Sequence, residues 1–213
     1  ATSSEDGTQA TTSSTLEVSV SGVADALTLT VEAASGAEDS AIALDITSSL
    51  SDTDGSETLS LTVTGIPDGA ILSAGTLNDD GSVTLTPGQL DGLTITPPAD
   101  SSADFNLTIT ATTSEDGTSA TTSSTLEVTV SGVADTPSVT VNAASGAEDS
   151  AIALDITSSL SDTDGSETLS LTVTDIPEGA ILSAGTLNDD GSVTLTPEQL
   201  DGLTITPPAD SSA

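Results

Sequence analysis

The sequence predicts an all-β fold, and three observations support this prediction. Apolar and polar residues alternate with a period of two in at least seven short runs. Thr and Ser fill most of the polar positions, where the strand preference of Thr helps and both side chains suit an exposed face. Asp-Gly, Pro-Asp-Gly and Pro-Pro turn signals separate the runs. Each strand is therefore expected to bury one face and to expose the other.

The expected strands follow in order, beginning with one at about residues 27–33, whose later counterpart contains Val139 and Val141. The other strands are indicated by these alternating apolar sets: Ile42, Leu44 and Ile46; Leu59, Leu61 and Val63; Val83 and Leu85; Leu93 and Ile95; Phe105, Leu107 and Ile109; Leu126, Val128 and Val130. The exception is segment 196–202, where Thr196, Pro197, Gln199 and a closing Gly predict a single helical turn.

The chain repeats itself. Residues 1–103 align with residues 111–213 without a gap and differ at only 11 positions, so the period is 110 residues. A period of this length is a whole domain, and near-identity indicates a tandem array. We expect residues 1–25 to be the tail of a preceding repeat and 26–135 to be a complete repeat. Residues 136–213 would be a repeat without its last two strands, which would be disordered, trimmed or supplied by a neighbouring molecule.

Seven or eight short strands in one period are typical of a β-sandwich of the immunoglobulin or cadherin kind, with Greek-key connections. The Cys and Trp marks of true immunoglobulin domains are missing. We therefore expect tandem Ig-like or cadherin-like sandwiches in architecture only.

The charge is the most unusual property of the composition. There are 34 Asp and Glu residues and no Lys, Arg or His, so the formal charge is −34. No salt bridge between side chains can neutralise a carboxylate, and self-repulsion opposes compaction. Hydrophobic residues still make up 34% of the chain, which sets it apart from a disordered acidic tail. The folded protein is therefore expected to need cations.

Composition also excludes several classes of function. A chain without a basic residue cannot neutralise phosphates, so nucleic acid is not an expected partner. There is no apolar run long enough to insert into a membrane. An enzyme is not expected, because a Ser nucleophile would lack its His base and the carboxylates lie at turns. Paired carboxylates could serve a glycosidase, but no aromatic platform for a sugar accompanies them. No small-molecule substrate is expected.

The carboxylates gather at turns. The densest group contains Asp52, Asp54 and Glu57 around Gly55, and alternating acids on a short loop suit a hard cation such as calcium. The other interpretation is a solvated Asp-Gly turn. Weaker groups are Glu38 with Asp39, Asp79 with Asp80, Asp100 with Asp104, and Glu115 with Asp116. For Asp79 with Asp80, and for Glu115 with Asp116, an ordinary hairpin turn is an equally good interpretation.

The expected topology brings these acids to a joint between repeats. Loops of a Greek-key sandwich alternate between its two ends. Glu38, Asp39 and Asp100 would then face Asp162, Asp164 and Glu167 of the following copy, with Asp135 in the short linker between them. The candidate ligands are Asp25, Glu38, Asp39, Asp52, Asp54, Glu57, Asp100, Asp104, Asp116, Asp135, Glu148, Asp149, Asp162, Asp164 and Glu167.

Four segments resemble the extender repeats of giant bacterial RTX adhesins. They are Gly36-Ala37-Glu38-Asp39, Asp52-Thr53-Asp54-Gly55-Ser56-Glu57-Thr58-Leu59, Leu93-Thr94-Ile95-Thr96-Pro97-Pro98 and Val133-Ala134-Asp135. The resemblance covers the whole repeat and implies a cadherin-like sandwich with several calcium ions per domain, one of them at the linker. It also implies type I secretion, an extracellular place at the bacterial cell surface, neighbouring repeats as partners, and a spacer role that projects a distal adhesive domain.

Two other interpretations compete with a spacer. Thr-x-Thr recurs, as in Thr84-Leu85-Thr86 and Thr94-Ile95-Thr96, and Thr arrays on a flat sheet could bind ice. A module that binds ice or glycan is therefore the alternative function, although Thr is also the ordinary outward residue of a twisted strand. The third interpretation is adaptation to high salt, which explains acidic surfaces but not the clustering of Asp at turns.

Overall fold

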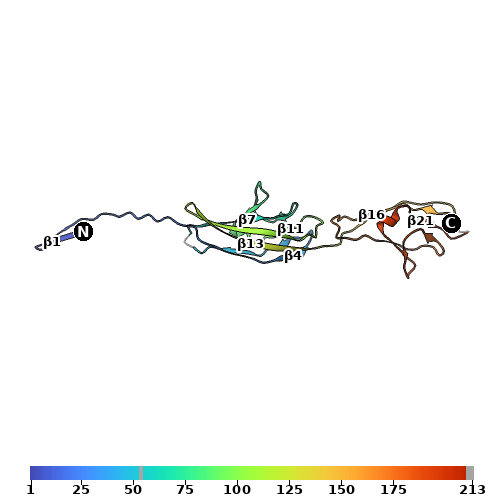
Figure 1. Cartoon of the computed structure of the whole chain (residues 1–213), viewed down its shortest axis with the longest axis horizontal. Coiled ribbons are helices and arrows are strands. Elements are labelled where there is room, and N and C mark those ends of the chain that lie inside the picture. Colours follow the sequence, from blue (N-terminus) through green and yellow to red (C-terminus); the bar gives the residue numbers. More distant parts are fainter. Residues whose placement is uncertain (53–54, 210–213) are drawn as a thin grey trace.

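The computed structural model describes residues 1–52 and 55–209, and its regular structure is all β, as predicted. Two short 3-10 helices accompany the strands within these ranges. The chain forms an elongated particle with its termini at opposite ends (Figure 1). A small hairpin lies at the N-terminal end, followed by an extended segment, the central copy (residues 26–135) and the second copy (residues 136–213).

The N-terminal hairpin consists of β1 (Thr2–Glu5) and β2 (Thr8–Thr11), which pair antiparallel. Beyond it, residues 12–27 form no strand. The alternating apolar side chains of this segment find no facing sheet, so Leu16, Val18 and Val20 are 87%, 75% and 89% exposed.

The central copy carries the main core. Its elements are β3 (Thr28–Val31), β4 (Ala34–Ala37), β5 (Ile42–Ala43), β6 (Ile46–Ser49), β7 (Thr58–Thr64), β8 (Ile71–Leu72), β9 (Thr76–Leu77), β10 (Val83–Leu85), η1 (Pro87–Gln89), β11 (Thr94–Thr96), β12 (Phe105–Glu115) and β13 (Thr118–Ser131). One sheet has the order β4-β13-β12-β7-β10-β9, a second has β5-β11-β8, and β3 pairs with β6. Buried side chains from all three sheets form one cluster, exemplified by Leu61, Ile95 and Ile46.

The longest strands form the β12–β13 hairpin, in which Phe105 to Glu115 pair with Val128 to Thr118. β12 also pairs with β7, and β13 pairs with β4 in parallel. The hairpin therefore joins the two flanks of the six-stranded sheet. Its inward side chains, including Leu107, Ile109 and Leu126, are fully buried.

One expected strand is wrong. The alternation of Ile42, Leu44 and Ile46 predicts a single strand, but the chain passes from β5 to β6, which lie in different sheets. The Leu44 N–H donates to the Leu93 carbonyl (2.9 Å) at this crossing. All three side chains are buried, because alternation records which face meets the core and not which strand supplies the hydrogen bonds.

The second copy retains a reduced version of the same structure. Its elements are β14 (Ser138–Val141), β15 (Ile152–Ala153), β16 (Ile156–Ser159), β17 (Leu171–Val173), β18 (Ile181–Leu182), β19 (Thr186–Leu187), β20 (Val193–Leu195), η2 (Pro197–Leu200) and β21 (Thr204–Thr206). The helical turn expected from Thr196, Pro197 and Gln199 is confirmed as η2, with the Thr196 N–H donating to Gln199 Oε1 (2.9 Å).

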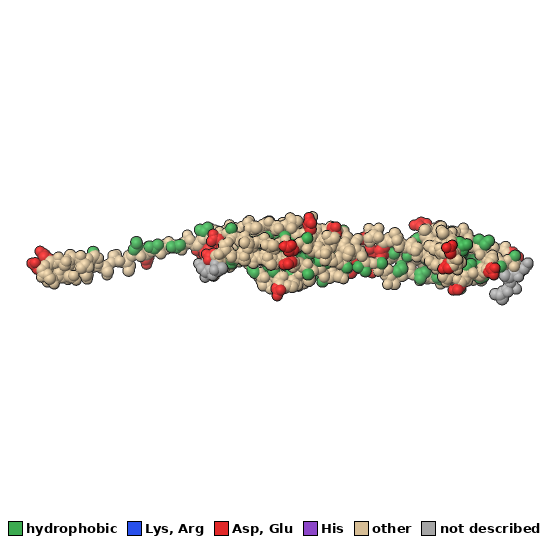
Figure 2. Space-filling model, turned by 90° about the horizontal axis from the view of Figure 1, so that it is seen from below, with side chains coloured by type: hydrophobic (Ala, Val, Ile, Leu, Met, Phe, Trp, Pro, Cys, Tyr) green, Lys and Arg blue, Asp and Glu red, His purple; other side chains and the backbone are tan. Residues whose placement is uncertain are grey.

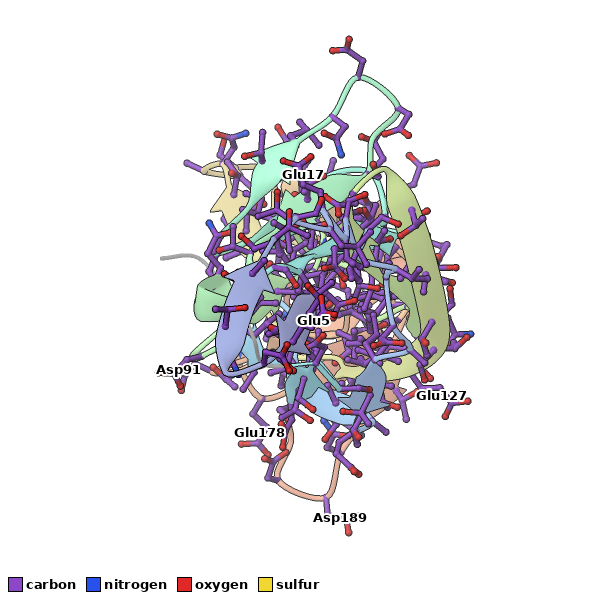
Figure 3. The ribbon with its side chains drawn as sticks, turned by 90° about the vertical axis from the view of Figure 1, so that its left-hand side faces the viewer. Glu5, Glu17, Asp91, Glu127, Glu178 and Asp189 are labelled. Carbon is purple, nitrogen blue, oxygen red and sulfur yellow. The ribbon has the colours of Figure 1, made fainter. Side chains whose placement is uncertain are left out.

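The two copies are also turned relative to each other. The projecting loop of the central copy, near β7, and the corresponding loop of the second copy point to opposite sides of the long axis (Figure 1). Seen along that axis, Asp91, Glu127, Glu178 and Asp189 extend outward from the body (Figure 3).

Within the described residues, no helix is long and apolar enough to cross a membrane.

Candidate metal centre

Acidic side chains meet at the joint between the central and second copies (Figure 2). The first group joins Glu38, which follows β4, to Asp162 and Asp164, which follow β16. One carboxylate oxygen from each of the three lies within 4.8 Å of the others. Glu38 and Asp162 are each only 1% exposed. Asp164 is exposed. Two copies thus contribute to one acidic group with two buried members, which we call the buried triad.

A second group, the linker triad, contains Asp39, Asp100 and Asp135, again with one carboxylate oxygen each within 4.8 Å. Asp39 and Asp100 have φ values of 55° and 52°, a left-handed conformation that Asp tolerates better than most residues. The Asp100 N–H donates to Asp39 Oδ1 (3.1 Å), which ties the two turns together. Asp135 comes from the linker after β13, so all three parts of the joint are represented in the two triads.

Backbone amides fix the carboxylates in place. The Val133 N–H donates to Glu38 Oε1 (2.6 Å), and the Asp135 N–H donates to Glu167 Oε1 (2.6 Å). The linker is therefore held from both sides, once by the central copy and once by the second copy. These amides satisfy one oxygen of each Glu and leave the other oxygen available.

Those other oxygens have no protein partner. Glu38 Oε2 and Glu167 Oε2 are both buried without a hydrogen bond. A buried carboxylate oxygen without a partner costs free energy, and a carboxylate beside two others costs more. A cation would remove both penalties. The donor set contains oxygen only, which suits calcium, since calcium takes six to eight oxygen ligands including carboxylates and backbone carbonyls.

The surroundings at the joint shift the pKa of one carboxyl group of the linker triad. Partial burial raises the pKa of Asp100, and the negative charges of Asp39, Asp135 and Asp162 raise it further. Because no basic side chain exists in the sequence, nothing in the protein offsets this repulsion. A bound cation would do so.

Asp164 behaves in the opposite way. Hydrogen bonds from the side chain and the backbone of Ser166 lower its pKa, and the backbone and side chain of Ser102 reinforce this effect. The Ser102 N–H donates to Asp164 Oδ2 (3.1 Å) across the joint. Sequence reasoning missed Ser102, because a Ser in a polar turn carries no pattern that marks it as a cross-joint donor.

The loop at the other end of the central copy repeats part of this arrangement. The Asp25 N–H donates to Glu57 Oε1 (2.5 Å), as Asp135 does to Glu167. Glu57 is 9% exposed, and its Oε2 is also buried without a partner. Asp52 lies in the same loop, and the expected ligand Asp54 lies outside the described residues.

The remaining expected ligands belong to neither triad. Asp104 Oδ1 accepts from the Val130 N–H (2.8 Å), and Asp116 Oδ2 accepts from the Gly22 N–H (2.9 Å). Glu148 and Asp149 are exposed. These four residues stay predictions as ligands.

No protein-family model matches the chain, and no curated protein sequence matches it.

Proposed function

We propose that this chain is a structural extender of a large secreted bacterial adhesin, in which calcium at the joints stiffens a row of similar domains. The observation that carries the proposal is the pair of acidic triads, built from the central copy, the linker and the second copy together. A cation at the buried triad would bind the central copy to the second copy, and a cation at the linker triad would bind the linker to the central copy, so both ions bind well only when these parts are aligned. The free energy of calcium binding then also stabilises the aligned arrangement of the two copies.

The residues suited to hold the ions are those of the two triads, with Glu167 beside them through its unpartnered oxygen. Calcium would supply the positive charge that the sequence lacks. The protein side chains hold the linker amides, bring the carboxylates together and exclude water from Glu38 and Asp162. Several ions per domain are part of the proposal, since the loop around Glu57 repeats one feature of the joint.

The finer assignments rest on the resemblance to RTX adhesin extender repeats. They comprise an Ig-like or cadherin-like Greek-key sandwich for each full period, type I secretion and a place at the bacterial cell surface. The elongated arrangement, with the termini at opposite ends, supports a spacer, because each added copy lengthens the particle.

The test measures thermal unfolding and small-angle X-ray scattering in EDTA and in millimolar calcium. Calcium should raise Tm and should make the maximum dimension longer and better defined. A double variant, Asp162→Asn with Asp164→Asn, should lose most of the change in scattering.

A charge-matched control separates the loss of the joint site from the loss of two negative charges. Asp91→Asn with Glu127→Gln removes the same two charges from side chains that point outward (Figure 3). Equal effects of the two double variants would mean general screening and not a joint site. An unchanged Tm and maximum dimension in the unaltered protein would overturn the proposal.

A further inference from the structure

The tip of the β12–β13 hairpin reaches the linker that precedes the central copy. The turn at the tip has Asp116 and Gly117 at φ values of 45° and 82°, which is the backbone of a two-residue hairpin turn. The segment it meets, Gly22 to Asp25, is more than 90 positions earlier in the chain. This contact is separate from both acidic triads, which lie at the opposite end of the central copy.

Three hydrogen bonds join the linker to the hairpin. The Gly22 N–H donates to Asp116 Oδ2 (2.9 Å), and the Ala24 N–H donates to Thr118 Oγ1 (2.7 Å). Thr113 Oγ1 donates to the Asp25 carbonyl (2.8 Å), and Thr113 is fully buried. The two amides that donate, Gly22 and Ala24, are two residues apart, as on one edge of a strand, and Val23 between them faces solvent at 64% exposure.

Gly22 permits this approach. A Cβ at this position would lie 1.9 Å from Glu115 Oε1 and 2.7 Å from Glu115 Cγ. The Glu115 side chain thus covers the linker backbone at the place where any other residue would carry a side chain.

The hairpin turn does not need the linker in order to form. The N-terminal hairpin has the same tip sequence, Glu5 to Thr8, and its tip is exposed. Thr8 Oγ1 donates to the Glu5 carbonyl at 2.7 Å, and Thr118 Oγ1 donates to the Glu115 carbonyl at 2.7 Å. The tip is therefore preformed, and the linker docks onto it.

We propose that the hairpin tip is a docking element for the preceding linker, and that it fixes the course of the linker by hydrogen bonds without a metal ion. The partner is a Ser-Gly-Val-Ala-Asp segment of the same protein. The same segment sequence occurs at residues 21–25 and again at 131–135. The joint before the central copy then has two fastenings that meet at Asp25: the acidic loop around Glu57, and a clasp made by the hairpin.

The experiment follows amide hydrogen exchange of Gly22 and Ala24 by NMR in calcium buffer. Asp116→Ala should speed exchange at Gly22 about tenfold, the effect of losing one hydrogen bond to a charged acceptor, and Thr118→Val should do the same at Ala24. Asp116→Asn keeps an acceptor and tolerates positive φ, so it should restore most of the protection. Asp6→Ala and Thr8→Val, the same changes in the free hairpin, should leave both amides unaffected.

Two outcomes would overturn the clasp. One is unchanged exchange at Gly22 and Ala24 in both hairpin variants while the β7–β12 amides stay protected. The other is a lower number of bound calcium ions in Asp116→Asn, which would make the tip a cation ligand. The exchange readout stands even if the unaltered chain binds no calcium, so failure of the calcium proposal can be told apart from failure of this one.

Discussion

The central and second copies share nearly the same sequence and differ in structure. In the central copy, β7 covers seven residues, and the matching β17 of the second copy covers three. Ala34 to Ala37 form β4, and the corresponding residues 144–147 form no strand. Leu61 is fully buried, whereas Leu171 is only partly buried. The β12–β13 hairpin of the central copy covers residues 105–131, and the corresponding positions of the second copy, 215–241, lie beyond the 213 residues of the sequence.

The comparison separates two kinds of structure. Elements that depend on neighbours in sequence occur in both copies: the turn before β10 and β20, a 3-10 helix, and the short ladders around them. Elements that depend on the hairpin shorten or disappear. In the central copy, β7 and β4 pair with the hairpin, and their counterparts in the described part of the second copy have no such partner.

The largest effect should come from breaking the hairpin core. Leu126 in β13 is fully buried, and Leu16, its equivalent one period earlier, is 87% exposed. Leu126→Ala should lower the free energy of unfolding by about 2 to 5 kcal/mol, through lost burial and the cavity left behind. Leu16→Ala should change it by less than about 0.5 kcal/mol. Urea unfolding of both variants measures the difference, and similar values would contradict the assigned burial.

The next effect concerns the joint. Glu38 lies in the buried triad, and its equivalent Glu148 is exposed. Glu38→Gln should remove most of the stabilisation supplied by the ion at the buried triad, which is about 2.7 kcal/mol for calcium at one hundred times its Kd. Glu148→Gln should keep it. Calorimetric titration with calcium checks both variants, and equal losses would argue for diffuse ion binding.

A smaller effect is expected when Asp100 is replaced, and the change in Tm should have opposite signs in EDTA and in calcium. Its folded-state pKa is raised, so its repulsion opposes folding once the carboxyl group ionises. Stability in EDTA should therefore fall as pH rises from 3.8 through the raised pKa. Asp100→Asn should increase Tm in EDTA at neutral pH, and this gain should vanish in acid. In calcium the same variant should lower Tm, because a ligand is lost. A gain under both conditions would exclude Asp100 as a ligand.

The smallest effect tests the structure that the two copies share. Asp80 Oδ1 accepts from the Ser82 side chain (2.6 Å) and backbone (3.0 Å), and Asp190 does the same with Ser192. These bonds lower the pKa of both carboxyl groups, so they add stability above pH 3.8 that is lost as pH falls. Ser82→Ala and Ser192→Ala should raise the two pKa values equally, as measured by NMR titration. Unequal shifts would mean that the turn depends on its surroundings.

Sequence reasoning could predict the parts of the fold that are local. The alternation of Leu59, Leu61 and Val63 marks β7, and Thr196 with Pro197 marks the start of η2. It could not predict the parallel pairing of β13 with β4, because both strands have the same pattern whichever partner they take. The division of the Ile42 to Ile46 run between two sheets was hidden for the same reason.

The candidate metal centre likewise has features that the sequence reveals and features that only the structure shows. Carboxylates at turns are visible in the sequence, and alternating loop ends suggest that Glu38 and Asp162 lie at one joint. The sequence does not show that Glu38 is buried with one oxygen unpartnered, since burial depends on how the two copies pack. It also gives no sign that Asp116 holds Gly22, because the contact joins a turn to a linker far away in the chain.

The parallel pairing of β4 with β13 determines how the central copy carries tension. β4 lies near the start of the copy and β13 at its end, with Ala34 to Ala37 opposite Val128 to Ser131. Pulling on the two ends of the copy draws these parallel strands in opposite directions along their length. The paired positions are then loaded together in shear, and they do not open one after another like a zipper. Strand β13, which packs against the core, thus also bears load when the two ends of the central copy are pulled apart.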